Sequence, residues 1–341
     1  MAVSTKPVNL IRVIKVSGLM TLLLLLGILG ALLLGTAEVG FRDLLDLLSG
    51  AEAKDQMSYL IIFKIRLPRI ILAGLAGFSL SVGGAVFQAI LRNPLAEPFI
   101  LGVSSGAAFG AVLGITAGLG FGFGIPACAF AGALTTVAIV MMIARRKMGM
   151  ESATTLLAGV IVNAFFTAII MFFVATSTDD RLHTMLFWLY GDLSQSRMSE
   201  SLVALPVVAT GFFLLYAFAR HLNLMAMGEE AALHMGVDVE KAKIYCFVAV
   251  SLITGLIVSF TGLIGFVGLI VPHILRMIIG PDHRLLLPAS GLGGALFLIW
   301  ADTLARTLVQ PSELPVGVIT AAMGAPFFIY LLRKKGGGHW H

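Results

Sequence analysis

The sequence predicts an all-α polytopic membrane protein with about ten transmembrane helices per subunit. Its composition is the first reason: of 341 residues, 58% are hydrophobic and 12% are charged, whereas a soluble domain has about 25% charged residues. The mean hydropathy is +0.99. The second reason is patterning, because the apolar residues form runs near the ~20 residues that cross a hydrocarbon core of ~30 Å. Basic residues gather at the ends of these runs.

The stretch 66–98 gives the clearest of these helices. No charged residue lies between Arg69 and Arg92, so this part is long enough to span a bilayer. Small residues in its interior allow neighbouring helix backbones to approach closely in lipid. These residues are Gly74, Gly77, Ser79, Ser81, Gly83, Gly84 and Ala85. We therefore expect this helix to pack inside a bundle.

The run 16–37 is predicted to be the first transmembrane helix, preceded by a cytoplasmic segment, 1–15. A signal peptide is the alternative, but the run is longer than the apolar region of a signal peptide and lacks a clear cleavage site. Between this helix and the stretch 66–98, residues 41–48 mix leucines with charges. That pattern favours a short amphipathic helix at the membrane interface.

The remaining helices are predicted from apolar runs bounded by glycines, prolines or charges. The expected ranges are 99–118, 125–144, 153–175, 201–219, 244–260, 262–280 and 285–304, with a last helix that ends at Arg333. We expect 262–280 to be interrupted at Pro272 and His273, because proline removes a helical hydrogen bond. The segment 176–199 is expected to be a polar loop, 220–243 the longest polar segment, and 336–341 a flexible tail.

The distribution of basic residues predicts the orientation of the chain. With the N-terminus inside and about ten alternating helices, most basic residues lie in the cytoplasm, as the positive-inside rule requires. Both termini are then cytoplasmic, and Arg66, Arg69 and Arg306 lie on the outer side. The net charge of +5 follows from this topology, so we expect no nucleic-acid partner.

Arg66 and Arg69 suggest a contact surface on the outer side. Residues three apart share a helix face, and exposed arginines pair well with carboxylates of a partner protein. Anchoring to lipid phosphates is the alternative.

The cytoplasmic stretch 224–237 suggests a second contact. Its Glu-Ala-Ala sequence followed by Gly236 predicts a short helix with an abrupt end, since glycine suits a left-handed cap. Such a helix between two membrane helices can transmit motion from a partner. An ordinary loop helix is the alternative.

Polar residues at membrane depth are sparse. Asn93 and Pro94 predict a stiff turn after the helix in 66–98, which forms either a constriction or a plain connector. Gln88, Asn163, His273 and Asp302 lie in or near apolar runs, where an ionisable residue suggests function. Since they form no ladder, we favour structural roles, with Asp302 capping a helix or pairing with Arg306 four residues later.

Several sites are missing from the sequence. It has no G-x-x-x-x-G-K-[ST] motif and no Gly-Lys dipeptide, hence no phosphate-binding loop of that type. It has no H-E-x-x-H or C-x-x-C, and we predict neither a catalytic residue nor a metal site. Cys128 and Cys246 are expected to be buried spacers. A proton- or sodium-coupled secondary transporter and an intramembrane enzyme are alternatives, although buried carboxylates for such a carrier are scarce.

Five stretches resemble permeases of ATP-binding-cassette (ABC) importers of the FecCD type, a family that includes permeases for vitamin B12, ferric siderophores and haem. They are RLPR at 66–69, GAVFQAILRNPLAEPFILGVSSGA at 84–107, GEEAALHMGV at 228–237, GFVGLIVPHILRMIIGPDHRLLLP at 265–288 and ELPVGVITAAMGAPFFIYLL at 313–332. The resemblance implies one permease domain, 1–341, with the fold of the vitamin B12 permease, a type II importer.

The resemblance also implies partners. A second copy of the chain, two ATPase subunits and a periplasmic or lipid-anchored substrate-binding protein would assemble in a bacterial or archaeal cytoplasmic membrane. The cargo would be a ferric siderophore, haem or cobalamin. ATP and magnesium would be bound by the ATPases, and this chain would hold no cofactor.

Family positions match three sets of residues in this sequence. Arg66, Arg69 and Arg306 match residues that dock the binding protein, while Asn93 and Leu95 match a cytoplasmic gate. The segment 220–243 matches the part that couples to the ATPase, at Gly228, Glu229, Glu230, Ala231, Ala232 and Gly236. Because this sequence has two adjacent glutamates there, the resemblance leaves open which one matters.

Overall fold

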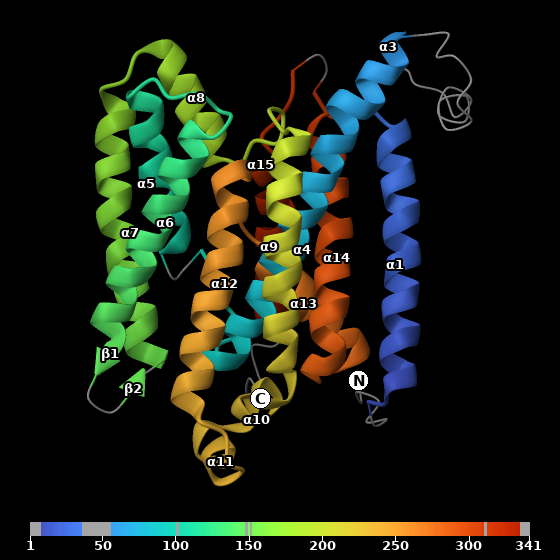
Figure 1. Cartoon of the computed structure of the whole chain (residues 1–341), viewed down its shortest axis with the longest axis vertical. Coiled ribbons are helices and arrows are strands. Elements are labelled where there is room, and N and C mark those ends of the chain that lie inside the picture. Colours follow the sequence, from blue (N-terminus) through green and yellow to red (C-terminus); the bar gives the residue numbers. More distant parts are fainter. Residues whose placement is uncertain are drawn as a thin grey trace.

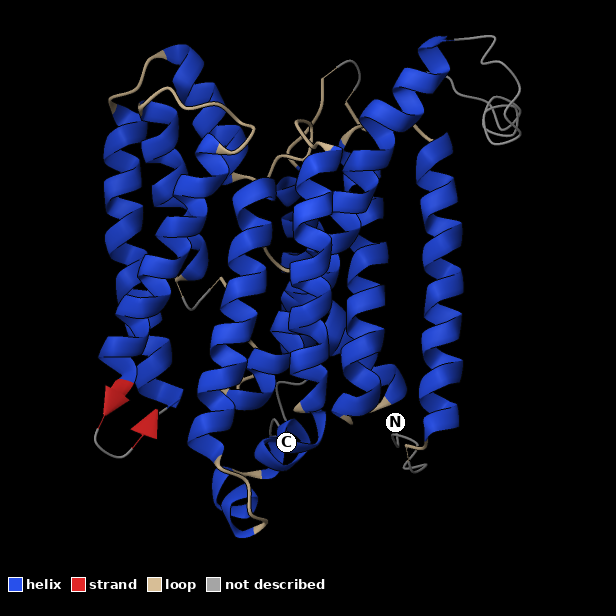
Figure 2. Cartoon of the chain, in the orientation of Figure 1, coloured by secondary structure: helices blue, strands red, loops and turns tan. Residues whose placement is uncertain are grey.

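The computed structural model describes residues 8–35, 56–99, 102–146, 149–150, 152–309 and 312–334. The described chain is a bundle of roughly aligned helices (Figures 1 and 2). Seven helices are long and apolar enough to cross a membrane, and three shorter apolar helices accompany them. The predicted all-α bundle with about ten spans is thus confirmed. The predicted interfacial helix at 41–48 and the tail 336–341 lie outside the described residues.

The structure gives the bounds of each element. The apolar helices are α1 (Leu10–Leu33), α4 (Leu67–Ile90), α5 (Val103–Thr116), α6 (Gly124–Ala144), α7 (Ser152–Ala175), α9 (Met198–Ala217), α12 (Val239–Thr261), α13 (Val267–Ile279), α14 (His283–Ala305) and α15 (Val316–Lys334). Shorter helices are α3 (Gln56–Tyr59), the π-helical turn η1 (Leu60–Arg66), α8 (Asp179–Leu189), α10 (Ala219–Met227) and α11 (Glu229–His234). Strands β1 (Arg145–Arg146) and β2 (Gly149–Met150) form a minimal antiparallel pair.

Two predictions are wrong, one about a connection and one about the course of a helix. The segment 176–199 is not a plain loop, because it contains α8. Helix α13 is not interrupted at Pro272 but continues through it. Proline has no N–H to donate to the carbonyl of Gly268, four residues earlier. The side-chain amide of Gln88 donates to that carbonyl instead, at 3.2 Å, so the helix is maintained at membrane depth.

The predicted helix in 66–98 also begins earlier than expected. A continuous helical segment extends over Met57–Ile90 and includes the π-helical turn η1 just before Leu67-Pro68. Pro68 cannot donate a hydrogen bond to the preceding turn, and a local π-helical register is one way to accommodate this. The inner part of the segment is predicted correctly, since α4 ends at Ile90.

Helix α4 is the central helix, and glycines set its distance from its neighbours. A Cβ added at Gly77 would overlap the backbone of Gly294 on α14, and one added at Gly84 would overlap Gly268 on α13. Small residues at such crossings let backbones approach, which is how helices associate in lipid. The small residues seen in the sequence therefore do pack α4 inside the bundle.

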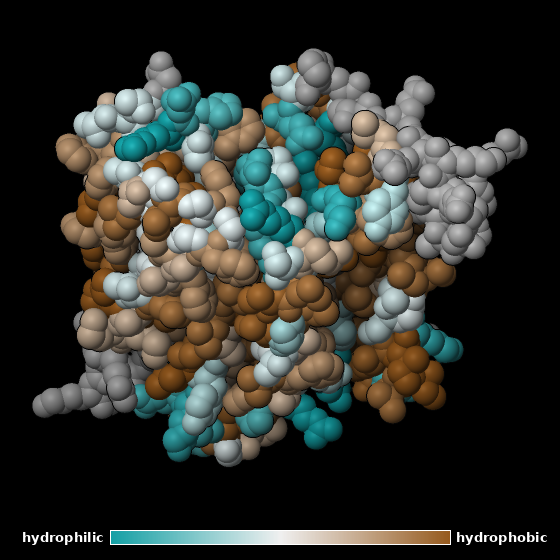
Figure 3. Space-filling model, turned by 45° about the horizontal axis from the view of Figure 1, so that its top comes forward, coloured by the Kyte–Doolittle hydropathy of each residue, from teal (hydrophilic) through white to brown (hydrophobic). Residues whose placement is uncertain are grey.

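The outer surface of the bundle is suited to a membrane. Figure 3 shows an apolar band across the visible face, with hydrophilic residues gathered toward its two ends. Large apolar side chains on α1, α7 and α9 are exposed, among them Leu22, Phe172 and Phe213. Exposed apolar surface of this extent is expected to face lipid or another protein.

Candidate functional site

The three predicted docking arginines lie together near the end of the bundle opposite α11, where α4 begins and α14 ends (Figure 1). They are buried, whereas the sequence predicts exposed arginines at this position. Arg66, Arg69 and Arg306 are 3%, 5% and 5% exposed in the chain. Buried charged groups require partners, and here the partners are within the same chain.

Arg69 is held by two carboxylates. Its Nε and Nη2 donate to Asp302 on α14 at 2.9 Å each, and its Nη1 donates to Glu313 at 2.6 Å. The two bonds to Asp302 form the bidentate geometry in which arginine binds a carboxylate most strongly. Arg69 therefore joins α4 to α14 and to the segment that precedes α15.

Arg66 and Arg306 bind the end of α1. Nη1 of Arg66 donates to the carbonyl of Leu32 at 2.6 Å, and Nη2 of Arg306 donates to the carbonyl of Ala31 at 2.6 Å. The last carbonyls of a helix lack helical partners and carry partial negative charge. The two arginines thus cap the C-terminal end of α1 in this structure.

The expected partnership of Asp302 with Arg306 is present but secondary. Nε of Arg306 lies 4.0 Å from the Asp302 carboxylate, farther than the nitrogens of Arg69. Sequence spacing pointed to the residue four positions away. The preferred partner lies on another helix, and only the packing of α4 against α14 brings it close.

The predicted gate residues form a tight turn after α4. The Asn93 side chain accepts the backbone N–H of Leu95 at 2.9 Å, which is the local bond typical of an Asx turn. Leu95 is 40% exposed.

The predicted coupling segment forms two short helices at the other end of the bundle, where α11 projects beyond its neighbours (Figure 1). Gly228 and Gly236 flank α11 at φ 140° and 83°, backbone conformations that favour glycine. Ala232 is fully buried, whereas apolar side chains beside it are exposed. The exposed ones are Met227 at 76%, Leu233 at 58% and Met235 at 67%.

The two glutamates of α11 have different surroundings. Glu229 accepts a hydrogen bond of 2.7 Å from Nζ of Lys243 on α12, and that lysine is 2% exposed. Glu230 and Ala231 are exposed at the tip. Glu229 therefore holds α11 on the bundle, while Glu230 faces outward.

A polar cluster beside α10 was not predicted from the sequence. Asn223 on α10 donates to Asp282 at 2.9 Å and accepts the backbone N–H of His283 at 2.8 Å. Burial by itself raises the pKa of Asp282, but hydrogen bonds from Arg284 and Asn223 favour the carboxylate and lower that pKa to about 2. Asp282 and His283 lie in the stretch 265–288 quoted above, but Asn223 is remote in sequence from them, so no spacing pattern joins it to this cluster.

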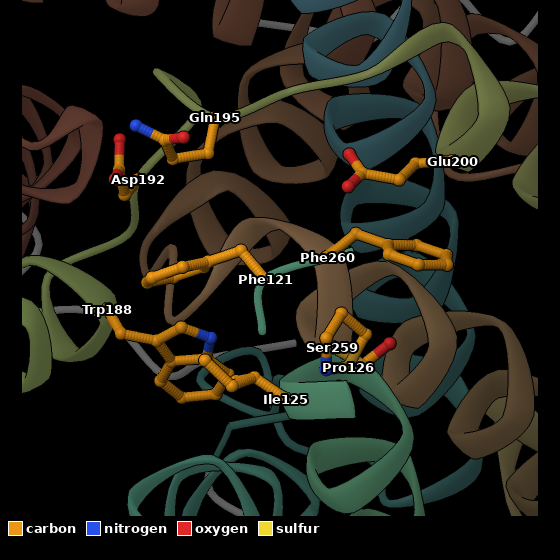
Figure 4. A pocket seen from close by; sticks show the side chains of 9 residues that line it. All are labelled: Phe121, Ile125, Pro126, Trp188, Asp192, Gln195, Glu200, Ser259 and Phe260. Atoms are coloured by element: carbon orange, nitrogen blue, oxygen red, sulfur yellow. The ribbon is translucent and has the colours of Figure 1, made fainter. Parts of the chain in front are cut away.

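A small pocket lies near the start of α9 (Figure 4). It is lined by Phe121, Ile125, Pro126, Trp188, Asp192, Gln195, Glu200, Ser259 and Phe260. The carboxylate of Glu200 accepts the backbone N–H of Arg197 at 3.0 Å and so caps α9. That of Asp192 accepts the N–H of Ser194 at 2.7 Å. Since both carboxylates serve the local backbone, we assign the pocket no ligand.

Metal-binding and thiol chemistry find little support in the described residues. Within them, no group of three or more His, Cys, Asp or Glu side chains gathers as a metal site. Both cysteines are free: Cys246 is buried and Cys128 is half-buried. The prediction that both cysteines are buried is therefore confirmed for Cys246 and only partly for Cys128.

Most of the chain is similar to known transport proteins. A model described as the FecCD transport family matches residues 22–334. The chain is 47% identical to a cobalamin import system permease protein of Halobacterium salinarum, over 82% of this chain and 75% of that protein. It is 38% identical to a hemin transport system permease protein of Yersinia pestis, over 93% and 95% of the two chains.

A solved structure agrees with the sequence relatives. It is described as an inward-facing conformation of a metal-chelate type ABC transporter. It superposes with a TM-score of 0.82 at 31% identity, covering 94% of this chain and 99% of that one. The likeness therefore extends over nearly the whole bundle.

Proposed function

Because the chain belongs to the FecCD transport family, we propose that it is the membrane-spanning permease subunit of an ABC importer for a metal chelate. The relatives named for cobalamin and hemin, and the metal-chelate transporter structure, support this cargo class. Ferric siderophores, haem and cobalamin are the candidates within it. The permease works in a bacterial or archaeal cytoplasmic membrane with both termini in the cytoplasm.

The observation that carries this function is the projecting helix α11. Leu233 of α11, with Met227 before the helix and Met235 after it, provides exposed apolar surface near the exposed Glu230, and apolar patches of this kind mark protein contacts. Two ATPase subunits bind such tips, one on each copy of the chain in a homodimer. They hold ATP and magnesium, since this sequence lacks the phosphate-binding loop.

At the opposite end, a substrate-binding protein docks near the arginine cluster. Arg66 and Arg306 donate to backbone carbonyls of α1, and carboxylates of the binding protein are stronger acceptors for arginine than neutral carbonyls are. Arg69 already has two carboxylate partners. We therefore assign docking to Arg66 and Arg306, with Arg69 fixing the helices that carry them.

The turn at Asn93 and Leu95 is the gate between the pathway and the cytoplasm. ATP binding brings the ATPases together and moves α11, and the gate changes its width in response. For work to be transmitted, the state that binds ATP must differ in its contacts at this turn.

The test is ATP hydrolysis by the assembled complex in lipid. The chain is purified with its ATPase and binding protein, and cobalamin, haem and a ferric siderophore are added in turn. We expect one loaded binding protein to stimulate hydrolysis, which also identifies the cargo. A chain that forms no complex with any ATPase, or whose uptake survives ATP depletion but not loss of the proton gradient, would contradict the proposal.

A further inference from the structure

The side chain of Asn223 on α10 joins the coupling segment to the turn between α13 and α14. Its Nδ2 donates to Oδ1 of Asp282 at 2.9 Å. Its Oδ1 accepts the backbone N–H of His283 at 2.8 Å and lies 2.7 Å from Nδ1 of the same histidine. Asp282 in turn caps α14 by accepting the N–H of Arg284 at 3.0 Å. The amide thus uses both of its ends to hold one turn.

Two groups of α13, the Arg276 side chain and the Gly268 carbonyl, bind Gln88 of α4, the helix that ends before the gate turn. Nη2 of Arg276 donates to Oε1 of Gln88 on α4 at 2.9 Å. The amide nitrogen of Gln88 donates to the carbonyl of Gly268, which Pro272 leaves without a helical donor. Gln88 is 5% exposed. It therefore bridges two points of α13, more than one helical turn apart, to α4.

These contacts hold α4 and α13 together. Their backbones are also in contact where Gly84 meets Gly268, so that a single added methyl group would not fit. Packed interfaces of this density transmit a displacement instead of absorbing it. A shift of the turn at Asp282 is therefore carried along α13 to α4, and α4 ends directly before the gate turn at Asn93.

We propose that Asn223 and Gln88 are positioning residues that transmit the movement of α11 to the gate. This inference rests on the proposed function, because it needs an ATPase that moves α11. Asn223 couples α10 to the α13–α14 turn, and Gln88 couples α13 to α4. The bond between Glu229 and Lys243 is a separate attachment, since it joins α11 to α12.

The chain offers a matched control. The hydroxyl of Tyr216 on α9 donates to the carbonyl of Arg284 at 3.2 Å, so it binds the same region without using Asn223. Tyr216→Phe removes one interhelical hydrogen bond and keeps the ring. A purely structural role for such bonds predicts equal effects of Tyr216→Phe and Asn223→Ala on gate movement.

The experiment measures the gate directly. Cys128 and Cys246 are replaced, and a spin label is attached through Leu95→Cys, a position 40% exposed. In the homodimer with its ATPases in lipid, the label-to-label distance is measured without nucleotide and with a non-hydrolysable ATP analogue. We expect the wild-type background and Tyr216→Phe to show the same ATP-dependent change. Asn223→Ala and Gln88→Ala should each reduce the population that responds by about fivefold or more.

A second pair of variants tests the Asn223–Asp282 bond without removing either side chain, so that loss of coupling can be told apart from misfolding. Asn223→Asp keeps the shape but sets a carboxylate against Asp282, and should uncouple the gate. Adding Asp282→Asn restores an amide–carboxylate pair and should recover part of the movement. The inference is overturned, and the proposed function is not, if Asn223→Ala and Gln88→Ala both show wild-type gate movement. The same holds if Asn223→Asp uncouples the gate and the double variant recovers no movement. If the unmodified complex shows no ATP-dependent change, the proposed function fails and the inference with it.

Discussion

Arg69 on α4 binds Asp302 on α14 through two hydrogen bonds of 2.9 Å, with 5% and 1% of these residues exposed. Because the pair is buried, each charge depends on the other. Glu313 adds a further bond to Arg69 from the segment before α15. The pair thus fixes the relative position of the helices that carry Arg66 and Arg306, the two arginines assigned to docking.

Breaking this pair should destabilise the fold more than it affects docking. Asp302→Ala leaves Arg69 buried with only Glu313 as a carboxylate partner, and we expect a loss of about 3–5 kcal/mol. Thermal unfolding of the detergent-solubilised chain measures it. Replacing both residues by apolar ones of similar size should cost less than the single change. Unchanged melting of Asp302→Ala would refute a structural role for the pair.

Removing the charge of the docking arginines should weaken binding-protein affinity. Arg66→Gln and Arg306→Gln keep a side-chain N–H donor, although a shorter one, for the α1 carbonyls but lose the positive charge. We expect each to weaken the complex by about tenfold, the effect of losing one charge-assisted hydrogen bond. Affinity is measured in lipid nanodiscs with the loaded binding protein. Lys241→Ala, an exposed change at the other end, is the control and should bind as the wild type does.

Substitutions of the two glutamates of α11 should have different effects, one on ATP hydrolysis and the other on stability. Glu230→Arg reverses the charge of the exposed tip and is expected to abolish stimulated ATP hydrolysis while the chain still folds. Glu229→Gln weakens the bond to Lys243 and should lower the melting temperature, with a loss of about 1 kcal/mol. If Glu229→Gln instead melts normally and Glu230→Arg hydrolyses ATP at the stimulated wild-type rate, the two roles are wrong.

Close packing at Gly84 predicts intolerance of a single methyl group. Gly84→Ala forces α4 away from α13, and we expect a cost of about 1–3 kcal/mol from overpacking. Gly18 on α1 has no atom within 4 Å of an added Cβ, so Gly18→Ala should be neutral or stabilising. Melting temperatures of the two variants in the same detergent test this. Equal melting would show that the helices can separate freely.

Acid should weaken the α13–α14 turn. The pKa of Asp282 is lowered from 3.8 to about 2 in the folded chain, so its contribution is present above pH 3.8 and is lost as the pH falls through 2. We expect this contribution to the free energy of unfolding to be about 1 kcal/mol, since the Asp282 carboxylate is partly exposed to solvent. Asp282→Asn should remove that part of the dependence. The measurement is unfolding between pH 5 and 2, and identical acid profiles would exclude this role.

The sequence by itself determined the fold class, the approximate number of helices and most of their positions. The hydrophobic effect acts on length and composition, and both can be read along a chain. It also located the short helix α11, because Gly236, which suits a left-handed cap, marks its end locally. The continuity of α13 through Pro272 was not predictable in this way, since its compensating donor, Gln88, is remote in sequence.

Only the tertiary structure decided what the polar side chains contact. The arginines expected to be exposed are buried against α1 and Asp302, because helices from distant parts of the chain meet there. The distinct surroundings of Glu229 and Glu230, and the joining of Asn223 to Asp282, have the same origin. In a bilayer an apolar surface finds a suitable environment almost anywhere, whereas a polar group is stabilised only by a specific partner. That partner is fixed by the packing of helices, which periodicity along one helix does not reveal.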